Sequence, residues 1–158
     1  RTYEKNGIKY AFFSYTTLTN GLNPPKGKEY LSNVYSDSKA KNDIDKVRDK
    51  VDVIIVAMHW GVEYTHEPTA YEKDMANYLA SLDVDVIIGT HPHVIQTVEW
   101  IENPENGHKT IVCYSLGNFI FDTDYQRAHP YTDRGILLKQ TALIPMDIYQ
   151  ATDNNPTS

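Results

Sequence analysis

Residues 53–61 read VIIVAMHWG, an apolar run that leads into a histidine. Residues 84–93 read VDVIIGTHPH and repeat the pattern, with two histidines at the end. A third apolar run, TIVCYS, follows at residues 110–115. Continuous apolar runs of this length are typical of strands buried on both faces, as at the centre of an α/β sheet. The sequence therefore predicts an α/β fold built around these three strands.

Two helical patterns lie between the predicted strands. Apolar residues recur at helical spacing within residues 37–50, so one face of that segment is apolar. Residues 69–82 begin with Thr69 and Glu72, which fit a capping box, and carry an apolar stripe that includes Tyr71. Helices that alternate with strands favour right-handed crossovers and a parallel sheet.

Further strands are predicted beside this central set. Residues 8–15 are rich in aromatic side chains, which strands favour. Residues 94–101 and 109–115 flank a turn with proline and glycine, and they predict an antiparallel hairpin. Residues 135–146 predict a last strand.

The composition is that of a globular domain. We expect residues 1–146 to form one domain and residues 147–158 to be a disordered tail. The net charge of −6 argues against a nucleic-acid partner. The single cysteine, Cys113, lies in an apolar strand pattern and is expected to be buried. No stretch is long and apolar enough to predict a membrane span, and no signal peptide is seen.

Three histidines follow the two central strands. In α/β sheets, chemistry collects beyond the carboxyl ends of the strands, and His59, His91 and His93 are expected there. Gly89 and Pro92 favour a tight turn around the second pair. Neutral imidazole is the commonest protein ligand for zinc, iron and manganese. Ordinary loop histidines are the alternative, but three at matched strand ends favour a site for one metal ion or two adjacent ones.

Two further polar residues are candidates for catalysis. Glu63 lies in the loop after His59, where a carboxylate can hydrogen-bond a leaving group or orient a ligand histidine. Asn118 follows the third strand, where its amide is suited to donate to a ligand oxygen. A solvated loop carboxylate and a turn-stabilising amide are the alternatives, and both stay open.

Three motifs together resemble a known family. They are HWGVEY at residues 59–64, GTHPHV at residues 89–94 and YSLGNFIFD at residues 114–122. In this order and spacing they resemble the CapA family of bacterial poly-γ-glutamate capsule biosynthesis proteins, which are related to calcineurin-like metallophosphatases. The resemblance runs from about residue 7 to about residue 143. It implies a metallophosphatase-like sandwich of mixed sheets flanked by helices, of which this chain is the C-terminal, incomplete half.

The resemblance also implies roles for the histidines. His59 matches the lone histidine ligand after a central strand, and His91 matches the histidine that binds the same metal. His93 matches the histidine that binds a second metal. The family's other ligands come from earlier motifs that this sequence lacks, so the resemblance places them in a missing N-terminal half. The implied cofactors are divalent ions of manganese, iron or zinc, two of them in the full-length protein.

The function implied is capsule biosynthesis by a protein with a metal-dependent, phosphoesterase-like hydrolase site, provided that the missing motifs exist. The alternative is a non-catalytic component of a complex that synthesises, exports or anchors the polymer. The expected partners are the missing N-terminal half or a second copy, and the capsule synthesis machinery. The resemblance implies an extracytoplasmic protein that is membrane-anchored at full length.

Overall fold

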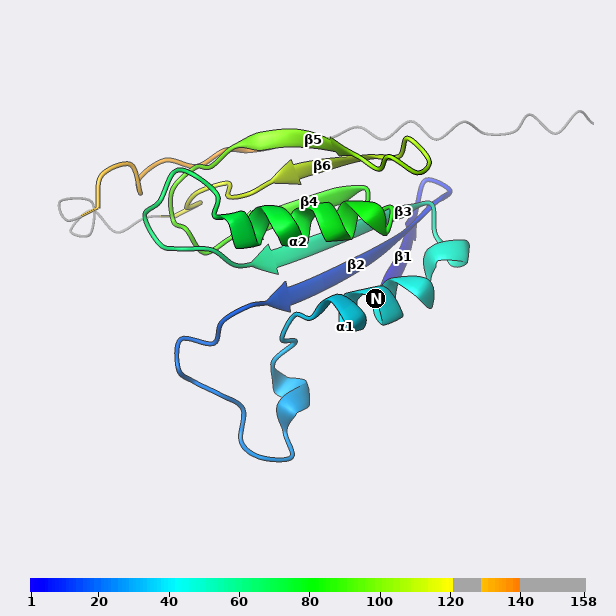
Figure 1. Ribbon diagram of the computed structural model, residues 1–158, viewed down its shortest axis with the longest axis horizontal. Helices are drawn as coiled ribbons and strands as arrows, with labels where there is room; N and C mark the ends of the chain where they lie inside the picture. Colours follow the sequence, from blue (N-terminus) through cyan, green and yellow to red (C-terminus); the bar gives the residue numbers. More distant parts are fainter. Residues whose placement is uncertain (121–128, 140–158) are drawn as a thin grey trace, which may run out of the picture.

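A computed structural model describes residues 1–120 and 129–139, and these residues form one six-stranded sheet (Figure 1). The strand order is β1-β2-β3-β4-β6-β5. The strands are β1 (Thr2–Lys5), β2 (Ile8–Thr16), β3 (Val53–His59), β4 (Val86–Thr90), β5 (Val98–Glu102) and β6 (Lys109–Cys113). The four inner strands are parallel, and β1 and β5 pair antiparallel at the two edges. The predicted α/β fold with a mixed sheet is confirmed.

Two α-helices cover the same side of the sheet (Figure 1). They are α1 (Asp37–Asp45) and α2 (Ala70–Ser81), and two short 3-10 helices accompany them, η1 (Glu29–Leu31) and η2 (Arg48–Lys50). Alternate residues of β3, namely Ile54, Val56 and Met58, are fully buried in the core beneath these helices. Ile44 and Leu79 reach this core from α1 and α2.

The other side of the sheet is only partly covered. One row of register partners runs across five neighbouring strands on that side. It consists of Phe12, Ile55, Val86, Ile111 and Trp100. Phe12 is 40% exposed and Trp100 is 59% exposed, whereas Ile55 is half-buried. We call this row and its neighbours the open face. Burial on both faces was predicted for the central strands, but within the described residues the helices cover one face only.

Several boundaries differ from the predictions. The helix predicted over residues 37–50 is divided, because Val47 leaves the helical region with φ −121° and a 3-10 turn follows. The strand predicted from residue 94 begins at Val98. The edge strand β1 was not predicted; it folds onto β2 through a turn at Asn6 and Gly7, whose φ angles are 55° and 78°.

The outcome of the other predictions is mixed. Strands β5 and β6 form the expected hairpin, and Cys113 is fully buried. The capping box of α2 is present, but Tyr71 is 62% exposed and Glu72 takes the buried position. Of the last predicted strand, Gly135 makes a single bridge with Gly117. Residues 140–158, which include the predicted tail, lie outside the described residues.

In the described part of the chain, no helix has the length and apolar character needed to cross a bilayer.

Candidate metal centre

The carboxyl ends of β3 and β4 bring the three histidines together. His59 is the last residue of β3 and is the register partner of Thr90, the last residue of β4. The ring centroids of His59 and His91 are 4.6 Å apart, and those of His91 and His93 are 6.1 Å apart. The three histidine rings therefore lie close together, as expected from the ends of the two strands.

A carboxylate from the neighbouring loop joins this cluster. Glu63, His91 and His93 each offer one ligand atom, and these three atoms lie within 4.8 Å of one another. Two imidazole nitrogens and one carboxylate oxygen form a donor set that suits zinc, manganese or iron. The residues present thus fit a metal ion, with His59 adjacent to His91. Glu63, predicted as a catalytic residue, lies where it can also act as a ligand.

The backbone is strained at this point of the chain. His91 has φ 104°, His93 has φ 60° and Tyr64 has φ 64°. Residues other than glycine rarely adopt positive φ, and three of the seven that do so in the described residues lie here. The two strained loops are tied together, because the Tyr64 amide donates to the Pro92 carbonyl at 2.8 Å. Such strain is typical of functional sites, where the surrounding structure holds an unfavourable geometry in place.

Neighbouring side chains contact two of the imidazole rings. The Nδ1 atom of His59 lies 3.1 Å from the Thr16 hydroxyl. The Nδ1 atom of His93 lies 2.9 Å from Asn118 Oδ1, and the Asn118 amide nitrogen donates to the Thr132 carbonyl at 2.8 Å. Asn118 therefore uses both ends of its amide within the protein, and its predicted donation to a ligand oxygen stays a prediction.

The electrostatic environment of His59 and His91 favours the neutral form of both imidazoles. Burial lowers the pKa of His59, and the nearby His91 and His93 lower it further. Burial also lowers the pKa of His91, although the Glu63 carboxylate acts in the opposite direction. Metal ions bind the neutral form of imidazole, so these environments suit the ligand role.

Packing beneath the site fixes the strand ends. Trp60 is fully buried, and its indole nitrogen donates to the Tyr114 carbonyl at 2.9 Å. Gly89 lies against both groups, and a Cβ atom there would collide with the Tyr114 carbonyl and the Trp60 indole. Trp60 is therefore a packing residue beneath the site.

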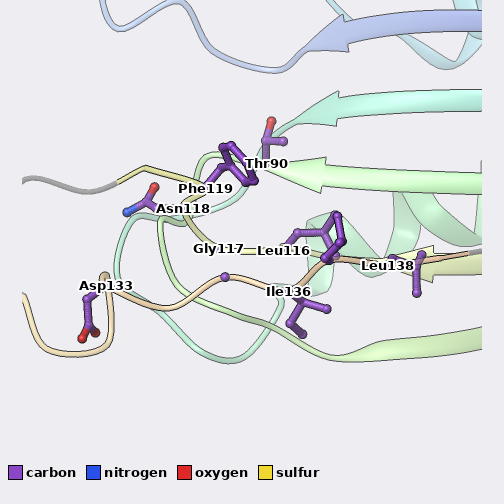
Figure 2. A pocket seen from close by; sticks show the side chains of 10 residues that line it. Thr90, Leu116, Gly117, Asn118, Phe119, Asp133, Ile136 and Leu138 are labelled. Carbon is purple, nitrogen blue, oxygen red and sulfur yellow. The ribbon is translucent and has the colours of Figure 1, made fainter.

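A cleft of about 510 Å³ opens beside the histidines. Its walls are mostly apolar and include Leu116, Phe119 and Ile136, and Thr90 and Asn118 also line it. Figure 2 shows the Asn118 side chain at the outer part of the cleft, with Leu116 and Ile136 closer to the strands. Since Asn118 contacts His93, the cleft adjoins the candidate metal centre.

Two side-chain contacts at the site were not predicted from the sequence. Thr16 reaches His59 from the end of β2, 43 residues away in the chain. The ring of His129 stacks on Tyr64 with centroids 3.7 Å apart, and Tyr64 in turn stacks on His93 at 6.0 Å. Both contacts join distant segments, which no local pattern in the sequence signals.

Comparison with known proteins identifies the family. The family model described as bacterial capsule synthesis protein PGA_cap matches residues 1–123. The chain belongs to this family. Over 114 residues it is 32% identical to the PGA biosynthesis protein CapA of Bacillus subtilis (strain 168). The matched part is 69% of this chain and 28% of that protein. Over 128 residues it is 30% identical to the capsule biosynthesis protein CapA of Bacillus anthracis. The matched part is 77% of this chain and 28% of that protein.

The match confirms the family resemblance carried by the three sequence motifs. This member of the capsule synthesis family spans somewhat more than a quarter of the length of the curated relatives it matches. All four candidate metal-centre residues, His59, Glu63, His91 and His93, lie inside the matched region.

Proposed function

We propose that this chain supplies part of the metal centre of a capsule (poly-γ-glutamate) biosynthesis protein with metal-dependent hydrolase activity. The observation that carries the proposal is the convergence of Glu63, His91 and His93 at the strand ends, with His59 beside them. The names of the two relatives, which refer to capsule and PGA biosynthesis, support the biological role.

The donor set bears on the choice of metal. Imidazole nitrogens with a carboxylate suit manganese, iron or zinc better than calcium, which prefers oxygen ligands. Glu63, His91, His93 and His59 are enough for one ion. The second ion implied by the family resemblance needs further carboxylates, which we propose come from another part of the full-length protein. A bound ion of this kind polarises a phosphoryl or carbonyl oxygen and lowers the pKa of water.

The residues of this chain would bind and orient the reacting groups. Glu63 is exposed, so its carboxylate can reach a ligand or a substrate. The cleft beside Asn118 would accept the less polar part of a substrate, since its walls are mostly apolar.

Glu63 has two candidate roles that kinetics can separate. If Glu63 is a ligand, Glu63→Gln weakens metal binding and activity returns at high metal concentration. If it is a general base, Glu63→Gln lowers the rate even when metal is saturating.

The test of the proposed function is hydrolysis of an artificial phosphodiester, and of poly-γ-glutamate, by the full-length protein with manganese, iron or zinc. We expect His91→Ala to abolish hydrolysis and His66→Ala to retain it, since the His66 ring is exposed and, among the described residues, contacts the Ile95 carbonyl and Tyr131 and none of the candidate ligands. Metal binding without hydrolysis of either substrate would instead favour the non-catalytic role.

That second role has its own support. The open face carries exposed apolar side chains such as Phe12 and Trp100, which suit a binding component of a polymer synthesis, export or anchoring complex. We propose the capsule synthesis machinery as the partner and the extracytoplasmic side of the membrane as the location, with the membrane anchor in another part of the full-length protein.

A further inference from the structure

We propose that Thr16 and Asn118 are positioning residues that hold His59 and His93 in one tautomer, so that both rings offer Nε2 to the metal ion. This inference rests on the proposed metal centre and deepens it. A neutral imidazole carries its proton on either Nδ1 or Nε2. The side chains that hydrogen-bond Nδ1 of His59 and His93 determine which, because each of them can only accept there.

Thr16 fixes the proton on His59. A threonine hydroxyl has one proton to donate and two lone pairs to accept with. The Thr16 hydroxyl donates its proton to the Leu18 carbonyl at 2.5 Å and accepts from the Leu18 amide at 3.3 Å. At 3.1 Å from His59 Nδ1 it can therefore only accept. His59 must carry its proton on Nδ1, which leaves Nε2 with a free lone pair.

Asn118 fixes the proton on His93 by the same reasoning. A backbone carbonyl only accepts, so the Asn118 group that faces the Thr132 carbonyl at 2.8 Å must be the amide NH₂. The side-chain oxygen of Asn118 then faces His93 Nδ1 at 2.9 Å. That oxygen also only accepts, so His93 carries its proton on Nδ1 and presents Nε2.

The two positioning residues lie at or after the ends of the strands that flank the ligand strands. Thr16 ends β2 and is the register partner of His59 at the end of β3. Asn118 follows β6, which pairs with β4 on the other side. The Thr17 amide also donates to the His59 carbonyl at 2.9 Å, which holds the two strand ends together. The flanking strands thus form a frame around the candidate ligands.

His91 differs from the other two histidines. Within the described residues its ring has ring contacts with His59 and His93 but no hydrogen bond that would fix its tautomer. His91 is therefore free to bind metal through either nitrogen. Neighbours that orient a metal-binding histidine are worth about 10- to 100-fold in metal affinity, so loss of Thr16 or Asn118 contacts should be measurable.

The first test reads the tautomers directly in metal-free, full-length protein labelled with ¹⁵N-histidine. Long-range ¹H–¹⁵N correlation spectra at about pH 8, where an ordinary histidine is neutral, should show protonated Nδ1 and bare Nε2 for His59 and His93. Thr16→Val should release the His59 tautomer alone, and Thr16→Ser should restore it. A wild-type spectrum with the proton on Nε2 of either histidine overturns the inference.

The second test measures zinc and manganese affinity by calorimetry. Thr16→Val and Asn118→Ala should each weaken binding by about 10- to 100-fold, whereas Thr16→Ser should stay near wild type. Thr17→Val is the matched control, because the Thr17 hydroxyl contacts the His59 carbonyl at 3.3 Å and not the ring. Equal losses in Thr16→Val and Thr17→Val would overturn the positioning role. If the wild type binds no metal, the proposed centre fails, and the tautomer spectra still decide the present inference on their own.

Discussion

At the scale of single residues, the candidate centre depends on where parallel strands end. His59 follows directly from its strand pattern, and His91 and His93 follow from the Gly89 and Pro92 turn, so all three were predictable from sequence. The contact of Thr16 with His59 was not predictable, because it needs the register between β2 and β3. The position of the Glu63 carboxylate beside His91 and His93 also depends on loop conformation, which sequence patterns do not specify.

Gly89 is expected to be indispensable for packing under the centre. In Gly89→Ala the new Cβ atom would push apart the Trp60 indole and the Tyr114 carbonyl. We expect the free energy of unfolding to fall by about 1–3 kcal/mol, the usual cost of overpacking. Urea unfolding followed by Trp fluorescence measures this.

The control for that experiment is Gly107→Ala. Gly107 has φ 75° but open space around it, so only the backbone penalty of about 1 kcal/mol applies. Equal costs for the two substitutions would show that the close approach at Gly89 is not important.

Asp85 at the opposite end of the sheet gives a pH-dependent prediction. Its carboxylate accepts from the Ile54 amide at 2.7 Å, and burial raises its pKa above the ordinary aspartate value. The folded state then binds the proton more tightly than the unfolded chain does, so ionisation weakens folding as pH rises through this pKa. Asp85→Asn keeps the acceptor oxygen without the charge, and should raise the free energy of unfolding at neutral pH by up to about 1 kcal/mol.

The advantage of Asp85→Asn should shrink as the pH falls towards the ordinary aspartate pKa of about 3.9, and should vanish below it, where both states of the wild type are protonated. Urea unfolding of both proteins over this pH range is the measurement. A variant that is less stable than wild type at neutral pH would mean that the attraction of Arg48 and His108 for Asp85 outweighs burial.

At the scale of elements, sequence patterns located both α-helices and five of the six strands, but not every boundary or face. The capping box predicted the start of α2, because its two hydrogen bonds are local. The prediction that Tyr71 belongs to the buried stripe of α2 was wrong, because the helix turns the neighbouring Glu72 towards the core and Tyr71 towards solvent. Helical periodicity alone does not separate two adjacent positions. Strand β1 was missed because its four residues are all exposed and show no burial pattern.

The capping box makes a prediction for α2. The Thr69 hydroxyl accepts from the Glu72 amide at 3.2 Å, while the Glu72 carboxylate accepts from the Thr69 amide at 2.7 Å. Thr69→Ala should lower the free energy of unfolding by about 1 kcal/mol, the usual cost of losing a helix cap. Circular dichroism during urea unfolding measures it. Thr69→Ser, which keeps the hydroxyl, should lose much less, and equal losses would contradict the capping role.

At the scale of the whole molecule, the open face is the feature that the described residues leave without a complete cover. The apolar runs of β3 and β4 predicted burial on both sides, and the helices satisfy one side only. We propose that another part of the full-length protein, or a second copy of this chain, covers Phe12, Ile55 and their neighbours.

This proposal predicts association. The 158-residue chain should form dimers or larger species in sedimentation experiments at high concentration, because exposed apolar area and edge strands favour pairing. Phe12→Asp should reduce association, and Leu22→Asp is a matched control, since Leu22 is an exposed apolar residue outside the sheet. A chain that stays monomeric and soluble at high concentration would contradict the proposal.

The central claim is that the strand-end histidines and Glu63 bind a metal ion. The most direct measurement is the metal content of purified full-length protein after exposure to manganese, iron and zinc and removal of loosely bound ions. We predict stoichiometric metal in the wild type and in His66→Ala, and loss of metal at this centre in His91→Ala and His93→Ala. Equal metal content in all four proteins, or none in the wild type, would contradict the account.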